Sequence, residues 1–163
     1  MTLPHRTILE THTLDWPDED ACAASAAALA AAPALRDAYV ELSGDLGAGK
    51  TTFVRHLLRS LGVSGRIKSP TYALVEPYEV DGGAVSHCDF YRFDDPREWD
   101  HAGLRDLFAA PGLKLVEWPE RAAALLPACD LRMELAAGDG GRRRVTLQAH
   151  TERGRALLAA MAR

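Results

Sequence analysis

Apolar side chains recur along this chain with two spacings, one typical of strands and one typical of helices. Residues 38–42 are β-branched and aromatic, as expected of a short buried strand. Residues 51–61 instead place their apolar side chains on one face of a helix, and Gly62 supplies a common helix end. The side chains on that face are Phe53, Val54, Leu57, Leu58 and Leu61. The pattern therefore predicts a strand and a helix joined by a glycine-rich turn.

The N-terminal part of the chain predicts an edge strand followed by a helix. Residues 7–14 alternate between apolar and polar side chains, which is typical of a strand with one exposed face. The acidic side chains of residues 15–20, together with Pro17, indicate the start of a helix. The alanine-rich stretch that follows is a good helix former, and we expect it to pack until Pro33 ends it.

Beyond Gly62 the pattern predicts two hairpins and three further helices. Residues 81–83 are typical of a hairpin turn, so the strands on either side should pair antiparallel. An apolar strand starts at Gly112 and ends at the acidic Glu117. In chain order, we expect a loop at 64–72, strands at 72–80 and 84–90, a helix at 94–108, the strand from Gly112, a helix at 119–126, a hairpin of 131–136 and 144–148, and a helix at 151–162.

This order of elements predicts an α/β fold, a P-loop NTPase-like mixed sheet of parallel and antiparallel strands flanked by helices. The chain has 163 residues and no internal repeat, so we expect one domain over residues 1–163. With 47% hydrophobic and 26% charged residues, its composition is that of an ordinary soluble globular protein.

Charge and cysteine content narrow the class of protein further. A net charge of -4 implies no general nucleic-acid-binding surface, without excluding a local basic patch. Cys22, Cys88 and Cys129 are scattered, with no C-x-x-C or zinc-like spacing, which favours free thiols in a reducing cytosol. The N-terminus has no long apolar run, and the most apolar stretch is too short and too alanine-rich to span a bilayer. We therefore expect a cytoplasmic protein with no membrane contact.

The turn between the first buried strand and its helix carries the clearest chemistry. Residues 44–51 fit the phosphate-binding P-loop pattern G-x-x-x-x-G-K-[S/T] without a mismatch, in the strand-to-helix context that the motif requires. Its glycines let backbone N–H groups point at phosphate oxygens, and the helix N-terminus adds partial positive charge. Lys50 would reach the outer phosphates, and the Thr51 hydroxyl would bind Mg²⁺. We therefore expect a nucleoside triphosphate site formed by Gly44, Asp45, Leu46, Gly47, Ala48, Gly49, Lys50, Thr51 and Thr52.

Two carboxylates at strand ends are candidate partners of the P-loop. Glu117 has the Walker B position, where Asp is more usual, and Asp89 ends the strand predicted before it. A P-loop enzyme needs a carboxylate for Mg²⁺ and a group that orients the attacking water, and ligands of open α/β sheets bind at strand ends. Either residue alone could equally be a solvated strand-end carboxylate. Thr71 is a candidate sensor of the γ-phosphate, with ordinary turn chemistry beside Pro70 as the alternative.

Three further features have a structural as well as a functional interpretation. His87 shares a strand face with Asp89, but a single strand histidine more often packs than catalyses, and a metal site with Cys88 lacks further ligands. Residues 142–144 form a basic turn that is more often solvated than bound to nucleotide, RNA or an acidic partner. Residues 11–16 are a weak candidate for contacts with the nucleotide base.

Four sequence blocks occur together in a specific order and spacing. They are the P-loop with Thr52, Ser69-Pro70-Thr71-Tyr72, His87-Cys88-Asp89-Phe90-Tyr91-Arg92 and Glu117-Trp118-Pro119-Glu120. In this combination the chain resembles, over nearly its whole length, the TsaE family, also called YjeE. These are small bacterial ATPases of the tRNA threonylcarbamoyladenosine modification pathway. A P-loop alone is common to many families, whereas the other three blocks together are specific.

The resemblance implies roles for individual residues. Lys50 and Thr51 would serve phosphate and Mg²⁺, and Trp118 would lie beside the nucleotide. Asp89 would help to position the water or the metal shell, and residues 69–72 would form a switch-like loop. The expected catalytic residues are therefore Asp89, Glu117, Lys50 and Thr71, and the expected magnesium ligands are Thr51 and Glu117.

The resemblance also implies cofactors and partners. ATP and Mg²⁺ would be the cofactors. Family members act with two subunits, TsaB-like and TsaD-like, that transfer threonylcarbamoyl to the adenosine next to the anticodon, so tRNA would be met indirectly through that complex. ATP hydrolysis would drive or reset the transferase complex rather than make the modification.

Two other interpretations stay open. A small-molecule or nucleoside kinase shares the P-loop scaffold, but it needs an acceptor pocket and an arginine-bearing lid. Residues 94–108 offer only Arg97 and Arg105 for such a lid. A binding module that holds ATP without turnover is the other alternative, and it is opposed by the intact set of Lys50, Thr51, Asp89 and Glu117.

Overall fold

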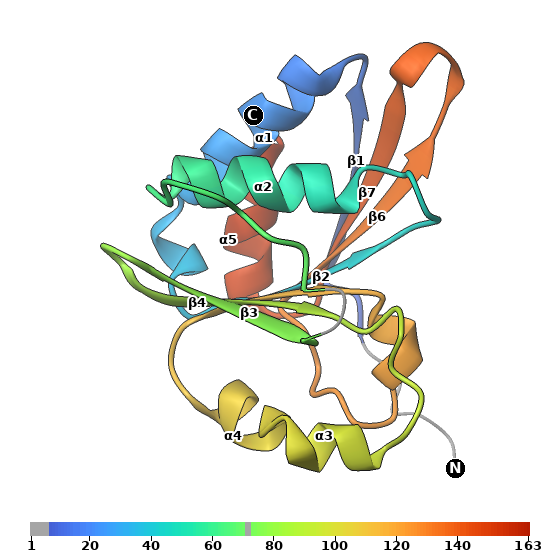
Figure 1. Ribbon diagram of the computed structural model, residues 1–163. Coiled ribbons are helices and arrows are strands. Elements are labelled where there is room, and N and C mark those ends of the chain that lie inside the picture. The colour runs from blue at the N-terminus through green and yellow to red at the C-terminus, as the bar shows by residue number, and fades with distance from the viewer. Residues whose placement is uncertain (1–6, 71–72) are drawn as a thin grey trace.

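A computed structural model of the chain describes residues 7–70 and 73–163. Its centre is one seven-stranded sheet with the order β1-β7-β6-β2-β5-β4-β3 (Figure 1). The strands are β1 Glu10–Trp16, β2 Tyr39–Ser43, β3 Val75–Val80, β4 Gly83–Asp89, β5 Leu113–Glu117, β6 Leu131–Ala137 and β7 Arg143–Ala149. β1 lies at an edge of the sheet, which confirms the edge strand expected in the N-terminal part.

The sheet mixes parallel and antiparallel pairs, as the sequence predicts. β2 runs parallel to both β5 and β6, and β4 runs parallel to β5. The pairs β3–β4, β6–β7 and β1–β7 are antiparallel, so both predicted hairpins are confirmed. Because β2, β5 and β4 run in one direction, the segments that follow these strands meet at the same edge of the sheet.

Helices cover both faces of the sheet and give the fold three layers (Figure 1). α1, α2 and α5 pack on one face, and α3 and α4 pack on the other. The helices are α1 Glu19–Ala30, α2 Lys50–Ser60, α3 Arg97–His101, α4 Leu104–Ala109 and α5 Glu152–Met161. Within the described ranges, no helix is both long enough and apolar enough to cross a membrane.

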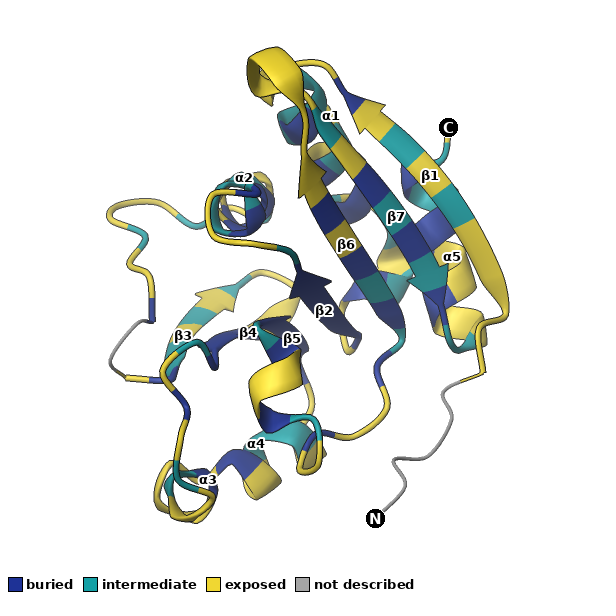
Figure 2. Cartoon of the chain, turned by 90° about the vertical axis from the view of Figure 1, so that its right-hand side faces the viewer, coloured by how far each residue is buried: buried dark blue, intermediate teal, exposed yellow. Residues whose placement is uncertain are grey.

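The alternation of side chains along β2 supplies both cores. Val40 and Leu42 belong to the core beneath α1, α2 and α5, whereas Tyr39 belongs to the core that includes Trp99 of α3. Because helices cover both faces, β2 and β5 are buried along their whole length (Figure 2). β2 and β5, which lead to the candidate site, are therefore enclosed on both faces.

The alanine-rich segment forms a packed helix, as expected. Asp18 caps α1 by accepting a hydrogen bond from the Ala21 N–H at 2.9 Å. The indole N–H of Trp16 donates to Ser25 Oγ at 2.9 Å, and its ring stacks on Phe53 of α2 with centroids 5.5 Å apart. These contacts hold β1 and α1 against the helix that follows the P-loop.

The helix after the P-loop is confirmed, with its apolar face and its end. Phe53, Val54, Leu57 and Leu58 are fully buried and Leu61 is partly buried. Gly62 has φ 99°, and the Val63 N–H beyond it donates to the Leu58 carbonyl at 3.0 Å. This bond closes the last turn in the way that a glycine after a helix allows.

Three predicted elements differ in extent. The helix expected at 94–108 is split into α3 and α4, because Gly103 between them has φ 67° and interrupts the helical backbone. The helix expected at 119–126 is only a 3-10 turn, Pro119–Ala122, after which the N–H groups of residues 125 and 126 both return to Ala122. The strand expected from Tyr72 begins at Val75, and Tyr72 itself lies outside the described residues.

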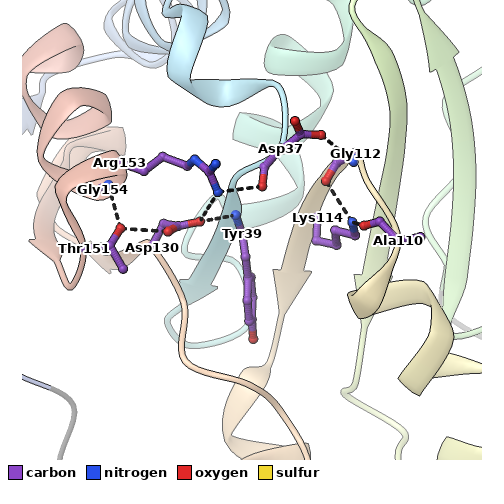
Figure 3. A network of polar contacts seen from close by, with 9 residues as sticks. All are labelled: Asp37, Tyr39, Ala110, Gly112, Lys114, Asp130, Thr151, Arg153 and Gly154. Atoms are coloured by element: carbon purple, nitrogen blue, oxygen red, sulfur yellow. Dashed lines mark hydrogen bonds and ion pairs between the residues drawn. The ribbon is translucent and has the colours of Figure 1, made fainter.

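Asp130 ties the beginning of β2 to the beginning of α5, at the opposite end of β2 from the P-loop (Figure 3). Its carboxylate accepts hydrogen bonds from the Tyr39 N–H at 2.8 Å and from the Thr151 hydroxyl at 2.7 Å. Thr151 in turn caps α5 by accepting from the Gly154 N–H at 3.0 Å. The Asp130 backbone lies so close to α5 that a Cβ added at Gly154 would be 1.9 Å from the Asp130 carbonyl oxygen.

We predict that Gly154→Ala destabilises the fold, although alanine is normally the better helix former by about 1 kcal/mol. The added methyl must displace the Asp130 backbone, and overpacking of this kind costs about 1–3 kcal/mol. Gly82→Ala is the matched control, because nothing lies within 4 Å of its added Cβ. Urea unfolding of both variants and the wild type measures the difference. A Gly154→Ala variant as stable as the wild type would contradict this contact.

Candidate functional site

The P-loop joins the end of β2 to the start of α2. Gly44 and Gly49 have φ values of 143° and 104°, in the range that residues with a Cβ rarely adopt. At Gly44 a Cβ would also lie 2.4 Å from the carbonyl oxygen of Leu135 on β6. The loop therefore packs directly on the neighbouring strand. α2 begins at Lys50, so the last residues of the motif form the first turn of the helix.

Strand register places Glu117 between the P-loop strand and Asp89. Glu117, at the end of β5, is paired with Leu42 near the end of β2 and with Asp89 at the end of β4. Glu117 is 1% exposed and Asp89 is 8% exposed. Two buried carboxylates thus lie side by side at the edge where the parallel strands end.

The two oxygens of Glu117 have different partners. Thr51 in the first turn of α2 donates its hydroxyl hydrogen to Oε1 at 2.9 Å. His87 Nε2 lies 2.6 Å from Oε2, and both side chains of this pair are almost completely buried. The carboxylate is therefore held from the helix on one side and from β4 on the other.

Lys50 is the positive group that faces these carboxylates. Its Nζ donates to the carbonyl oxygen of Gly44 and, at 3.2 Å, to that of Asp45. It also lies 4.0 Å from the centroid of the Trp118 indole, in a cation–π contact. Burial lowers the pKa of Lys50 below its ordinary value, and the neighbouring carboxylates, Glu117 foremost, oppose that shift.

Asp89 has a raised pKa. Burial of the carboxylate is the main cause, and the charge of Glu117 adds to it. The Tyr91 N–H donates to Asp89 Oδ1 at 2.9 Å and opposes the shift. A carboxylate with a raised pKa accepts a proton more readily, which is a property required of a general base.

Trp118 has an unusual backbone for a bulky residue. Its φ of 55° lies in the left-handed region, where the backbone of a residue other than glycine is strained. The strained turn directs the indole over Lys50 and against Tyr91, whose ring centroid is 4.9 Å away. The Glu-Trp-Pro-Glu block thus reverses the chain at the site and leaves an aromatic wall there.

These residues surround one open cleft of about 420 Å³. Seven of the predicted nucleotide-binding residues line it, from Leu46 to Thr52, together with Trp118, Glu117 and Asp89. Gly44 and Asp45 line a neighbouring depression instead. Thr71 lies outside the described residues, although Ser69 of the same block lines the cleft.

Arg143 belongs to the cleft, which the sequence did not single out. Its guanidinium donates to the carbonyl oxygen of Gly47 at 3.3 Å and lies beside Gly49. Arg142 and Arg144, its neighbours in the basic turn, are exposed and do not line the cleft. Arg144 instead lines the neighbouring depression with Gly44 and Asp45, so Arg143 is the residue of the basic turn that lines the cleft. Alternation along β7 puts Arg143 on the face of the buried Val145 and Leu147, but only the packing of the β6–β7 hairpin beside the loop brings that arginine to the P-loop.

A second, smaller pocket of about 140 Å³ adjoins the first turn of α2. Thr52 and Arg143 line it as well as the main cleft, so the two hollows share a wall. Of the segment 11–16, which was a weak candidate for base contacts, Trp16 is the residue that lines this pocket, with Asp18, Glu19 and Cys22 behind it.

The structure opposes a cysteine–histidine metal site. Cys88 lies in the core beside α3 and α4, whereas His87, its neighbour on β4, faces Glu117 on the other side. Within residues 7–70 and 73–163, no group of three or more His, Cys, Asp or Glu side chains could hold a metal ion. The Thr51 hydroxyl and the Glu117 carboxylate are oxygen donors of the kind that Mg²⁺ accepts alongside phosphate and water. Cys22, Cys88 and Cys129 are buried thiols outside any disulfide.

Comparisons with known proteins show the family of this chain. The family model "Threonylcarbamoyl adenosine biosynthesis protein TsaE" matches residues 16–145. The "tRNA threonylcarbamoyladenosine biosynthesis protein TsaE" of Haemophilus influenzae is 41% identical over 121 residues, which are 74% of this chain and 76% of that protein. The Bacillus subtilis protein of the same name is 34% identical over 123 residues, 76% of this chain and 77% of that protein.

A solved structure has the same overall fold. The crystal structure of Bacillus subtilis YdiB aligns with a TM-score of 0.77 at 27% identity, covering 96% of this chain and 97% of that chain. The residues matched by the family model include the P-loop, Asp89 and Glu117, which the fold brings to one cleft. Because the family model matches most of the chain and both relatives are more than 30% identical over about three quarters of it, this chain belongs to the TsaE family.

Proposed function

We propose that this chain is a magnesium-dependent ATPase that acts in the biosynthesis of threonylcarbamoyladenosine in tRNA. The observation that carries the proposal is the cleft in which Lys50 and Thr51 of the P-loop face the carboxylates of Glu117 and Asp89. The names of the relatives support the pathway, because they are called tRNA threonylcarbamoyladenosine biosynthesis proteins.

Phosphate binding falls to the P-loop and to the start of α2. The backbone N–H groups of the loop and the N-terminus of α2 offer partial positive charge to an anion. Lys50 adds a full positive charge, and its reach over Trp118 directs that charge into the cleft. Bound Mg²⁺ would neutralise charge that develops on the phosphates. Thr51 and Glu117 would hold it, because their hydrogen-bonded oxygens lie at the inner end of the cleft.

Asp89 orients the attacking water in this proposal. Its carboxylate lines the cleft, is held by the Tyr91 N–H, and has a raised pKa. These properties suit a group that accepts a hydrogen bond from water and draws off its proton. Glu117 is less suited to that task, because His87 and Thr51 already occupy its two oxygens.

In this proposal, ATP hydrolysis serves to change the conformation of partner proteins. We infer that the partners are TsaB-like and TsaD-like subunits of the threonylcarbamoyl transferase complex, through which the chain meets tRNA. Hydrolysis then drives or resets that complex between turnovers. Because the cleft is open, a bound partner would be needed to cover it and exclude water. Full activity would then require that partner.

A kinase is the second candidate, and the fold disfavours it. The segment considered for an arginine-bearing lid, residues 94–108, forms α3 and α4. These helices pack on the face of the sheet opposite α2, and of the described residues that line the cleft none comes from them. Arg97 instead pairs with Asp95 at 2.6 Å on the surface.

The first prediction concerns turnover. We expect slow ATP hydrolysis by the chain alone and a sharp rise when TsaB-like and TsaD-like subunits and tRNA are added, measured as phosphate release. Lys50→Ala should abolish hydrolysis in both conditions while the circular dichroism spectrum stays that of the wild type. Turnover that does not change when the partners are added would favour a kinase instead, and a screen of phosphate acceptors would then follow.

The second prediction concerns the buried charge of Asp89. Asp89→Asn should raise the melting temperature at pH 7 and abolish hydrolysis with little loss of ATP binding, because it removes an ionised group that burial disfavours. For an acid whose pKa is raised by folding, the penalty is full above the folded pKa and absent below the ordinary value of 3.8. The stability difference between variant and wild type should therefore shrink as the pH falls. A variant that is less stable than the wild type at pH 7 would contradict this account.

The third prediction concerns Arg143. Arg143→Ala should weaken ATP binding roughly tenfold, the effect of losing one charge-assisted hydrogen bond to phosphate. Arg142→Ala is the matched control, since Arg142 is exposed and lies outside the cleft. Isothermal titration calorimetry compares the two variants. Equal losses in both would reduce Arg143 to a general contribution of positive charge.

A further inference from the structure

His87 is a fully enclosed side chain on β4, the strand next to the edge strand β3. It lies on β4 between Glu76 of β3 and Leu115 of β5, and its side chain is 1% exposed. Strand alternation directs it to the same face as Asp89 and away from the core around Cys88. Packing alone could be served by any apolar residue, so the presence of a polar ring at this position calls for a separate reason.

The hydrogen bond to Glu117 determines how the imidazole is protonated. An ionised carboxylate only accepts hydrogen bonds, so at 2.6 Å from Glu117 Oε2 the proton must be on His87 Nε2. Nδ1 is buried and has no hydrogen-bond partner among the described residues. A proton there would leave a buried N–H unsatisfied, which is costly. A ring that donates from Nε2 and carries no proton on Nδ1 fits both observations, with its single hydrogen bond directed at Glu117.

Resting on the function proposed above, we propose that His87 is a positioning residue for the magnesium site. It holds Glu117 Oε2, so that Oε1 remains aimed at the Thr51 hydroxyl and at the position where Mg²⁺ would bind. His87 does not line the cleft, so its ring would not contact a bound nucleotide. It acts only through Glu117, in the way that outer partners of metal ligands usually orient them.

The bond from Nε2 to Glu117 also gives a reason for a histidine at this position, although its Nδ1 has no partner among the described residues. Without a donor at Oε2, the carboxylate of the buried Glu117 would lose one of its two hydrogen bonds and could turn about its side-chain torsions. Thr51 alone cannot determine that orientation, because its hydroxyl hydrogen can rotate to meet either oxygen. Two bonds from opposite sides define the carboxylate plane where one does not.

Two substitutions separate positioning from packing. His87→Gln places an amide donor near the position of Nε2, whereas His87→Asn places it near the position of Nδ1, which has no partner in the described structure. Both are uncharged and polar. We measure ADP binding by calorimetry with Mg²⁺ and with EDTA. In H87N the dissociation constant with Mg²⁺ should rise about tenfold, while the value in EDTA stays at that of the wild type. H87Q should bind as the wild type does in both.

The outcomes distinguish this inference from the proposed function. Mg²⁺-dependent binding by the wild type with no loss in H87N, or equal losses in H87N and H87Q, would overturn the positioning role alone. A wild type that binds no ADP in either condition would overturn the proposed function and the positioning role with it. If a variant fails to fold, ¹⁵N spectra of histidine in the folded wild type provide the test, with the His87 ring assigned through its own backbone signals. They should show a protonated Nε2 and a bare Nδ1 for this ring, and the opposite tautomer would overturn the role.

Discussion

The hydrogen bond between Thr51 and Glu117 joins the two halves of the site, and the rest of its geometry depends on it. Thr51 belongs to the first turn of α2, whereas Glu117 ends β5, and their 2.9 Å contact links the P-loop to the sheet's acidic edge. The contact forms because β2 and β5 are parallel neighbours, so that both strands end at the same level. His87 and Asp89 are then placed relative to Glu117 by the register of β4 on β5.

The site concentrates ionisable groups that the fold would not bury for stability alone. Lys50 is 5% exposed and Asp89 is 8% exposed. Burial lowers the pKa of Lys50 and raises the pKa of Asp89, so it favours the neutral form of each. Buried charges are tolerated where they are paired and hydrogen-bonded. The carboxylates of the site face one ammonium group, and the strained backbone of Trp118 holds an indole against that group. Strain and displaced pKa values in one place are characteristic of sites that bind or react.

Local pattern was sufficient wherever one short segment contains the whole cause. The apolar face of α2, its end at Gly62 and both hairpin turns follow from side-chain period and from glycine chemistry, and all are present. The single helix expected at 94–108 was wrong because apolar spacing continues across a glycine whose backbone does not. The helix expected after Pro119 was wrong because the chain turns back on Ala122 and never builds a continuous ladder.

The sequence by itself determined that there is a P-loop between a strand and a helix, and that Glu117 and Asp89 end strands. Only the tertiary structure decided which side chains meet there. His87 bonds to a residue 30 positions away, and Arg143 to one 96 positions away. Alternation along a strand tells which face a residue takes, but not which strand will lie beside it. That neighbour is decided when the whole sheet assembles. Assembly places His87 against Glu117 and Arg143 against the P-loop, and no pattern within either segment predicts these contacts.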